Sequence, residues 1–119
     1  MRKLIDKEEH IMQILWKLGK AFMKEITEEI PKPKPPYNTL LSTIRKLEKD
    51  GFIGYKTFGK SNQYYPLIKK EQHQKSLLSH LKNEYFGGSK SSLLSYFMKA
   101  EKLTEQEVKE ILSQLKKGK

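Results

Sequence analysis

PYNTLLSTIRKLEKDGFIGYKTFGKSNQYYPL, residues 36–67, is the segment that decides the fold. Its first half places Leu40, Ile44 and Leu47 on one face of a helix, because successive residues turn by about 100°. Gly51 is well placed to end this helix, since glycine tolerates the left-handed conformation that closes many helices. The segment therefore begins with an amphipathic helix that stops at Gly51.

The outer face of this helix is polar and cationic. It carries Asn38, Ser42, Arg45, Lys46 and Lys49. Residues 52–58 and 63–65 then favour two strands, joined by a turn over Phe58–Asn62. Pro66 closes the second strand because proline cannot donate to a ladder. A cationic helix followed by a basic hairpin predicts the DNA-reading half of a winged helix.

The charge of the chain is strongly positive. The 119 residues include 24 Lys plus Arg and 14 Asp plus Glu, for a formal net charge of +10. Residues 1–70 carry 15 basic and 8 acidic side chains, so most of the excess lies in the half with the predicted reading helix. This balance favours a polyanionic partner, either nucleic acid or an anionic membrane surface. No apolar run approaches membrane-spanning length, so we expect no membrane insertion.

Several classes of chemistry are disfavoured by the residues present. The absence of cysteine excludes disulfides, thiolate zinc sites and cysteine nucleophiles. The three histidines, His10, His73 and His80, do not form a metal motif with nearby carboxylates. Gly87-Gly88 is a helix break, because the residues after it lack a phosphate-loop signature. We therefore expect no enzyme, no cofactor and no metal. The N-terminus has no secretory signal, which fits a cytoplasmic protein.

Two further helices precede the reading helix. Asp6 and Glu9 are spaced as a capping box for a helix that ends near Leu18. A second, short helix is predicted over Phe22–Ile30. Four prolines within residues 31–36 then favour an extended connector.

The C-terminal part of the chain predicts three amphipathic helices. The first begins near Ile68, so the helical region covers essentially residues 71–119. Ser89 is placed to cap the second helix, and Thr104 with Glu107 forms a capping box for the third. Each helix has one apolar stripe and buries little alone, so we expect the stripes to pair with a second copy of the chain. The alternative is that they cover the N-terminal core. The expected dimerisation residues are Leu77, Leu78, Leu81, Leu93, Leu94, Phe97, Val108, Ile111, Leu112 and Leu115.

Base contacts are expected from the start of the reading helix, since a helix in the major groove presents its N-terminal residues to base edges. These residues are Tyr37, Asn38, Thr39 and Ser42, with Thr43 on the flank. Asn38 has an equally good alternative role as the helix N-cap.

Phosphate contacts are expected further along the same segment. Arg45, Lys46 and Lys49 follow the base-reading positions on the helix. Lys56, Lys60, Ser61 and Asn62 belong to the wing, where contact with phosphates or the minor groove is the default.

Three segments, residues 8–30, 35–53 and 64–72, resemble the penicillinase-repressor (BlaI/MecI-type) family of bacterial winged-helix proteins. They read EEHIMQILWKLGKAFMKEITEEI, PPYNTLLSTIRKLEKDGFI and YYPLIKKEQ. Residues 85–89, 92–98 and 103–107 also follow that family's dimerisation region in order and spacing. The resemblance thus covers nearly the whole chain.

The resemblance implies a cytoplasmic homodimer that binds a dyad-symmetric DNA operator and represses β-lactamase or related resistance and stress genes. It also implies a membrane-bound sensor protease as a partner, cutting at the place that matches the Tyr96–Phe97 bond. These two residues fit plain dimer core as well. Leu41 stands where family members often have a polar or basic residue, which argues against assuming their operator sequence. The chain also lacks the cysteine cluster of copper-responsive relatives.

The predicted architecture is mostly α with a small β-wing. Residues 1–70 form a winged helix-turn-helix DNA-binding domain, and residues 71–119 form a helical dimerisation region. The predicted function is a sequence-specific transcriptional repressor. The alternative is a winged-helix module that binds protein without specific DNA binding, which salt dependence and sequence discrimination would distinguish.

Overall fold

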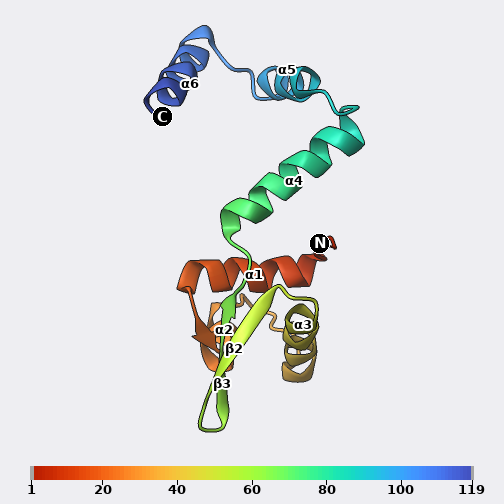
Figure 1. The fold of residues 1–119 in the computed structure, drawn as a ribbon, viewed down its shortest axis with the longest axis vertical. Coiled ribbons are helices and arrows are strands. Elements are labelled where there is room, and N and C mark those ends of the chain that lie inside the picture. Colours follow the sequence, from red (N-terminus) through yellow and green to blue (C-terminus); the bar gives the residue numbers. More distant parts are fainter. Residues whose placement is uncertain (1, 119) are drawn as a thin grey trace. The chain divides into compact units, whose positions relative to one another are not determined.

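The computed structural model describes residues 2–118 and divides into two compact units, one ending at His73 and the next beginning at Gln74. The N-terminal unit is the predicted winged helix, in which the hairpin turn projects beyond the helices (Figure 1). Its elements are α1 (Asp6–Leu18), β1 (Ala21–Phe22), α2 (Met23–Glu29), α3 (Tyr37–Lys49), β2 (Ile53–Phe58) and β3 (Ser61–Pro66).

Helix α3 has the amphipathic form that its sequence predicts, with Leu40, Ile44 and Leu47 buried. Gly51 ends the helix with a φ of 86° and donates to the carbonyl of Glu48 at 3.1 Å. The next amide, that of Phe52, donates to the carbonyl of Leu47 at 2.9 Å. These two bonds form a Schellman motif. The prediction that Gly51 closes the helix is confirmed.

The sheet has three antiparallel strands in the order β1-β3-β2. Sequence reasoning missed β1 and started a helix at Phe22. A strand of two residues has no periodicity to read, and β1 exists because Ala21 pairs with Tyr64 and Phe22 with Gln63. Helix α2 begins one residue later, at Met23.

The hairpin turn is tighter than the sequence suggested. The expected turn covered Phe58–Asn62, but Phe58 pairs with Ser61 and Thr57 with Asn62. Only Gly59 and Lys60 remain in the loop, and Gly59 takes a φ of 62°. Such two-residue loops match the twist of the flanking strands and require positive φ.

The core of this unit lies between α1, α2, α3 and the inner face of the sheet. The capping box of α1 lies one residue earlier than the expected pair, Asp6 and Glu9. Ile5 is the N-cap and Glu8, rather than Glu9, accepts its amide at 2.9 Å. The core residues are Leu4, Ile11, Met12, Ile14, Leu15, Ala21, Ile26, Leu40, Ile44, Leu47, Phe52, Ile53 and Tyr64.

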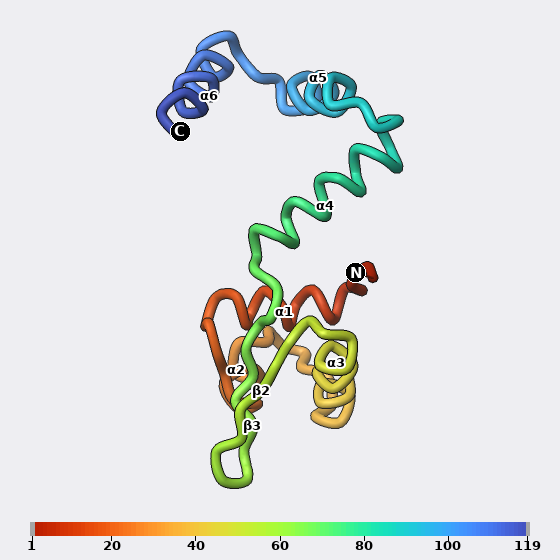
Figure 2. Tube along the Cα trace, in the orientation of Figure 1, coloured from red at the N-terminus to blue at the C-terminus, as the bar shows by residue number. Residues whose placement is uncertain are grey.

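The remaining helices, whose path Figure 2 follows, are α4 (Lys70–Tyr85), α5 (Lys90–Ala100) and α6 (Glu105–Lys117). The first turn of α4 belongs to the N-terminal unit, and the rest of these helices form the C-terminal unit. Both predicted caps are present. Ser89 Oγ accepts from the amide of Ser92 at 3.1 Å, and Thr104 and Glu107 cap each other's amides at 3.1 and 3.0 Å. Along these helices, all within the described part of the chain, no side chain is buried. Among residues 2–118, no helix has the length and apolar content needed to cross a membrane.

Candidate nucleic-acid interface

A groove of about 560 Å³ lies between α3 and the hairpin. Its lining comes from three places in the fold: helix α3, the hairpin of β2 and β3, and the end of β1 with the start of α2. The groove is lined by Phe22, Met23, Lys24, Tyr37, Leu41, Arg45, Glu48, Lys49, Tyr55, Lys60, Ser61, Asn62 and Tyr64.

Six residues predicted to contact DNA meet in this groove. Tyr37, Arg45 and Lys49 come from α3, and Lys60, Ser61 and Asn62 come from the wing. Among the described residues that line the groove, Glu48 is the only acidic one. The excess of cations gives the groove a positive potential, which attracts a polyanion.

Asn62 has a fixed orientation in the wing. Its Oδ1 accepts a hydrogen bond of 2.8 Å from Thr57 Oγ1. The side-chain carbonyl of Asn62 therefore faces Thr57, and its amide nitrogen keeps two N–H donors for another acceptor. A donor at this position suits a phosphate oxygen.

Asn38 and Ser42 are exposed on the strip of α3 beside the groove. The helix begins at Tyr37, with Pro36 as its N-cap. Asn38 therefore lies inside the first turn, and the alternative that its side chain caps the helix is wrong. The residue is exposed and so is accessible to a base edge or a phosphate in a complex.

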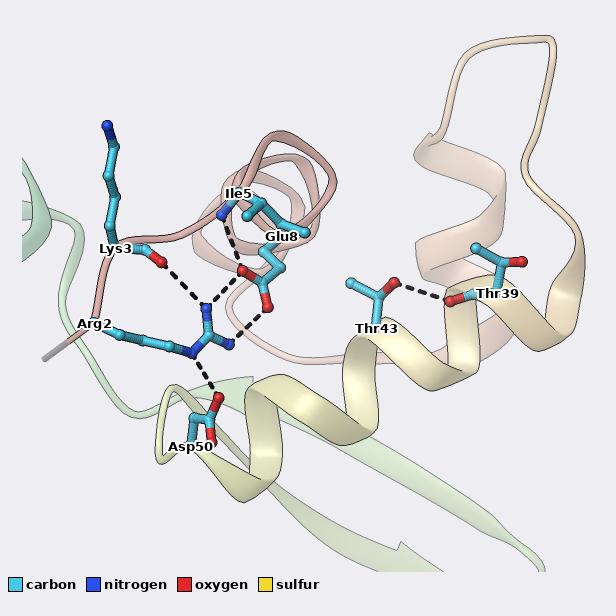
Figure 3. A network of polar contacts seen from close by, with 7 residues as sticks. All are labelled: Arg2, Lys3, Ile5, Glu8, Thr39, Thr43 and Asp50. Carbon is cyan, nitrogen blue, oxygen red and sulfur yellow. Dashed lines mark hydrogen bonds and ion pairs between the residues drawn. The ribbon is translucent and has the colours of Figure 1, made fainter.

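Thr43 differs from the other expected contact residues. It is 6% exposed, and its Oγ1 donates to the carbonyl of Thr39 at 2.9 Å (Figure 3). This side of α3 faces α1 and the proline connector, where Thr39 and Thr43 border a smaller depression of about 270 Å³. Since the side chain is covered and its hydroxyl proton is taken, we leave Thr43 out of the interface. Thr39 is exposed.

Two expected phosphate contacts lie outside the groove. The strand register puts Lys56 on the outer face of the sheet, opposite to that of Tyr55, and its Nζ lies 5.4 Å from the centre of the Phe58 ring. Lys46 is exposed on α3, and its charge acts on Glu8. Neither Lys46 nor Lys56 lines the groove.

Seven residues that line the groove were not among the predicted contacts: Phe22, Met23, Lys24, Leu41, Glu48, Tyr55 and Tyr64. Two of them had a readable signal, because Leu41 and Glu48 follow Tyr37 at the helical spacing of four and eleven residues. The other five come from β1, the start of α2 and the hairpin, and they reach the groove through tertiary packing, which local spacing does not show.

A cluster of charged residues lies at the C-terminal end of α3, where Arg2 pairs with Glu8 and with Asp50. Glu8 is 1% exposed, and its two carboxylate oxygens accept from Nη1 and Nη2 of Arg2 at 2.7 Å each (Figure 3). The Arg2 hydrogen bonds lower the pKa of Glu8 below its ordinary value, against the opposing effect of burial, and the amide of Ile5 assists. The same pairing raises the pKa of Arg2.

Residues 4–117 match the protein family described as penicillinase repressor. The chain belongs to the penicillinase repressor family. The methicillin resistance regulatory protein MecI of Staphylococcus aureus (strain N315) is 31% identical over 111 residues, covering 92% of this chain and 90% of that protein. MecI of Mammaliicoccus sciuri is 30% identical over the same length.

The likeness extends to three dimensions. The solution structure of the DNA-binding domain of the repressor BlaI covers 60% of this chain and 93% of that domain, with a TM-score of 0.53 and 24% identity. This likeness confirms the winged-helix fold. Membership of the penicillinase repressor family makes the chain a DNA-binding transcriptional repressor, as the sequence resemblance implied.

Proposed function

We propose that this repressor acts as a homodimer that binds a dyad-symmetric operator, with the groove between α3 and the wing as the DNA-binding surface of each subunit. The observation that carries the proposal is the meeting of cations from separate elements, Arg45 and Lys49 of α3 with Lys60 of the wing, in one groove. Cations that converge on one surface suit the regular phosphates of a duplex.

The two kinds of contact fall on different parts of this surface. Asn38, Thr39 and Ser42 are exposed in the first half of α3, where side chains of a major-groove helix reach base edges. Arg45 and Lys49 lie toward its end and would meet the backbone together with Lys60. Leu41 adds an apolar contact in the groove, of the type that packs on a thymine methyl group.

The apolar stripes of α4, α5 and α6 support the homodimer. In the single chain all ten expected dimerisation residues are exposed or half-buried, and Leu115 is 64% exposed. Exposed apolar stripes of this kind are costly to leave in water. A second copy would cover the same stripes symmetrically, and it would place two reading helices on two half-sites.

We also propose a class of target genes and a release mechanism, the latter from the family resemblance of residues 85–107. The relative MecI is a methicillin resistance regulatory protein, which favours resistance or stress genes as targets. A membrane sensor protease would relieve repression by cutting the Tyr96–Phe97 bond, which lies within α5, where Tyr96 is 62% exposed. Cleavage there requires local unfolding of α5 and would detach α6 from the dimerisation region.

The test is binding of the purified full chain to duplex DNA from upstream of its own gene and to a scrambled duplex, at two salt concentrations. We expect preference for the upstream duplex that survives the higher salt, and a dyad-symmetric footprint. Equal, salt-sensitive binding to both duplexes would contradict an operator in that region. The absence of binding to either duplex at low salt would favour the alternative, a winged-helix module that binds protein.

A further inference from the structure

Arg2, Glu8 and Asp50 form a cluster, here called the Arg2 clamp, that joins the N-terminal segment, α1 and the end of α3 (Figure 3). Two nitrogens of Arg2 bind the buried carboxylate of Glu8, and its third, Nε, donates to Asp50 Oδ2 at 2.6 Å. The guanidinium also lies 5.1 Å from the centre of the Phe52 ring.

The two ion pairs of the clamp differ in burial: the Arg2–Glu8 pair is buried at Glu8, and the Arg2–Asp50 pair is partly exposed. Glu8 is buried, and a buried carboxylate needs its partner, so Arg2 is fixed by the bidentate pair. Asp50 is the C-cap of α3 and about one-third exposed, so its bond to Arg2 is the more adjustable of the two. Through this bond, the C-terminal end of α3 is tied to a point fixed on α1.

We propose that Asp50 and Arg2 are positioning residues for DNA recognition, because their ion pair sets the angle at which α3 enters the major groove. This inference rests on the proposed role of the groove in DNA binding. The apolar face of α3 packs on the core without directional bonds, whereas a charge-assisted hydrogen bond has a preferred direction. The Arg2–Asp50 pair supplies such a bond at the end of the helix opposite to the base readers.

The length of α3 makes small changes of angle important. A helix of 13 residues is about 20 Å long, so a tilt of about 5° at its C-terminal end moves its first turn by about 1.5 Å. Such a displacement exceeds the tolerance of a hydrogen bond to a base edge. Phosphate contacts from long lysine side chains adapt to it more readily. Loss of the clamp should therefore weaken specific binding more than non-specific binding.

Charge alone predicts the opposite result. Asp50 places a negative charge on a helix that binds a polyanion, so removing it should strengthen binding to every duplex equally. Positioning and simple repulsion therefore differ in their effect on the ratio of specific to random affinity. A merely structural role would lower stability without changing this ratio.

The experiment uses the full chain and a duplex that the wild-type protein selects from a randomised pool, compared with an unselected duplex. Asp50→Ala should lower the ratio of selected to random affinity by about threefold to fivefold, the factor that an ion pair of this exposure can supply. Asp50→Glu keeps the carboxylate and should restore most of the ratio. Glu28→Ala is the matched control, since it removes one exposed carboxylate from α2 outside the groove, and it should leave the ratio unchanged.

An unchanged ratio for Asp50→Ala, with tighter binding to both duplexes, would overturn the positioning role and leave the proposed DNA-binding function intact. Failure of the wild-type protein to select any sequence would overturn the proposed function itself. Thermal unfolding of each variant identifies a loss of fold as the cause of any uniform loss of binding.

Discussion

The indole Nε1 of Trp16 donates a hydrogen bond of 2.8 Å to the backbone carbonyl of Ile68. Trp16 lies on α1, and Ile68 lies in the segment that leads from β3 to α4. The Trp16 ring also lies 5.2 Å from the ring of His73, whose Nε2 is 2.7 Å from Glu9 Oε1. These contacts attach the first turn of α4 to α1, which explains why the N-terminal unit extends to His73.

We expect Trp16→Phe to lower the free energy of unfolding of the N-terminal unit by about 1 kcal/mol, because it leaves the carbonyl of Ile68 without its donor. Urea unfolding at neutral pH measures the change. Gln13→Ala, on the exposed face of the same helix, is the control and should stay within about 0.5 kcal/mol of the wild type. A Trp16→Phe variant as stable as the control would mean that the bond to Ile68 contributes nothing.

Glu8 should make the free energy of unfolding depend on pH in the acid range. Its pKa is lowered in the folded protein from the ordinary value of 4.5, chiefly by the Arg2 hydrogen bonds. A group with a lowered folded pKa contributes stability that is complete above its unfolded pKa. That contribution is lost as the pH falls through the folded pKa.

Glu8→Gln should therefore cost about 2 kcal/mol of unfolding free energy at neutral pH, and the difference from the wild type should shrink below the unfolded pKa of 4.5. Urea unfolding over a series of pH values from neutral to acid measures both quantities. Glu28→Gln, an exposed carboxylate, should show neither effect. A constant difference between Glu8→Gln and the wild type at all pH values would contradict a lowered pKa of Glu8 in the folded protein.

The winged-helix fold was predictable because its decisive signals are local. Leu40, Ile44 and Leu47 repeat at helical spacing, and Gly51 stops the helix through a motif of neighbouring amides. In contrast, β1 forms only by pairing with β3, and its two residues have no period of their own. Signals that depend on distant partners cannot be read from spacing within one segment.

The candidate site was predictable in part for the same reason. Exposed positions of α3 follow from helical periodicity, so Arg45 and Lys49 could be placed on its polar face, which here lines the groove. Periodicity also placed Thr43 at the edge of the exposed face, but the packing of α1 and the proline connector covers it. The pairing of Arg2 with Asp50 joins residues 48 positions apart, and charge counts alone gave no sign of it.

The wing offers a matched pair of lysines. Lys60 lines the groove, whereas Lys56 lies on the outer face of the sheet. We expect Lys60→Ala to weaken binding to all duplexes and to reduce the slope of log affinity against log salt by about 1, because one phosphate contact is lost. Lys56→Ala should have a smaller effect on both quantities. Equal effects in a salt titration would show that the groove does not define the phosphate contacts.

The first half of α3 should control sequence preference. Ser42→Ala or Thr39→Ala should change which duplex is selected from a randomised pool, at a cost of about 1–3 kcal/mol at the affected base pair. Arg45→Ala is the comparison, because it should weaken selected and random duplexes by similar factors. If all three variants select the wild-type sequence, the division between base readers and phosphate contacts on α3 is wrong.

Helix α6 tests the proposed dimer. Leu112 is 53% exposed and lies on one stripe with Val108, Ile111 and Leu115. Leu112→Glu places a charge within that stripe, where burial against a second copy would cost several kcal/mol, so the variant should sediment as a monomer. Ser113→Glu adds the same charge to the opposite face of α6 and should remain a dimer. Sedimentation of both variants as dimers would exclude the α6 stripe from the interface, and a monomeric wild type would remove the dimer from the proposed function.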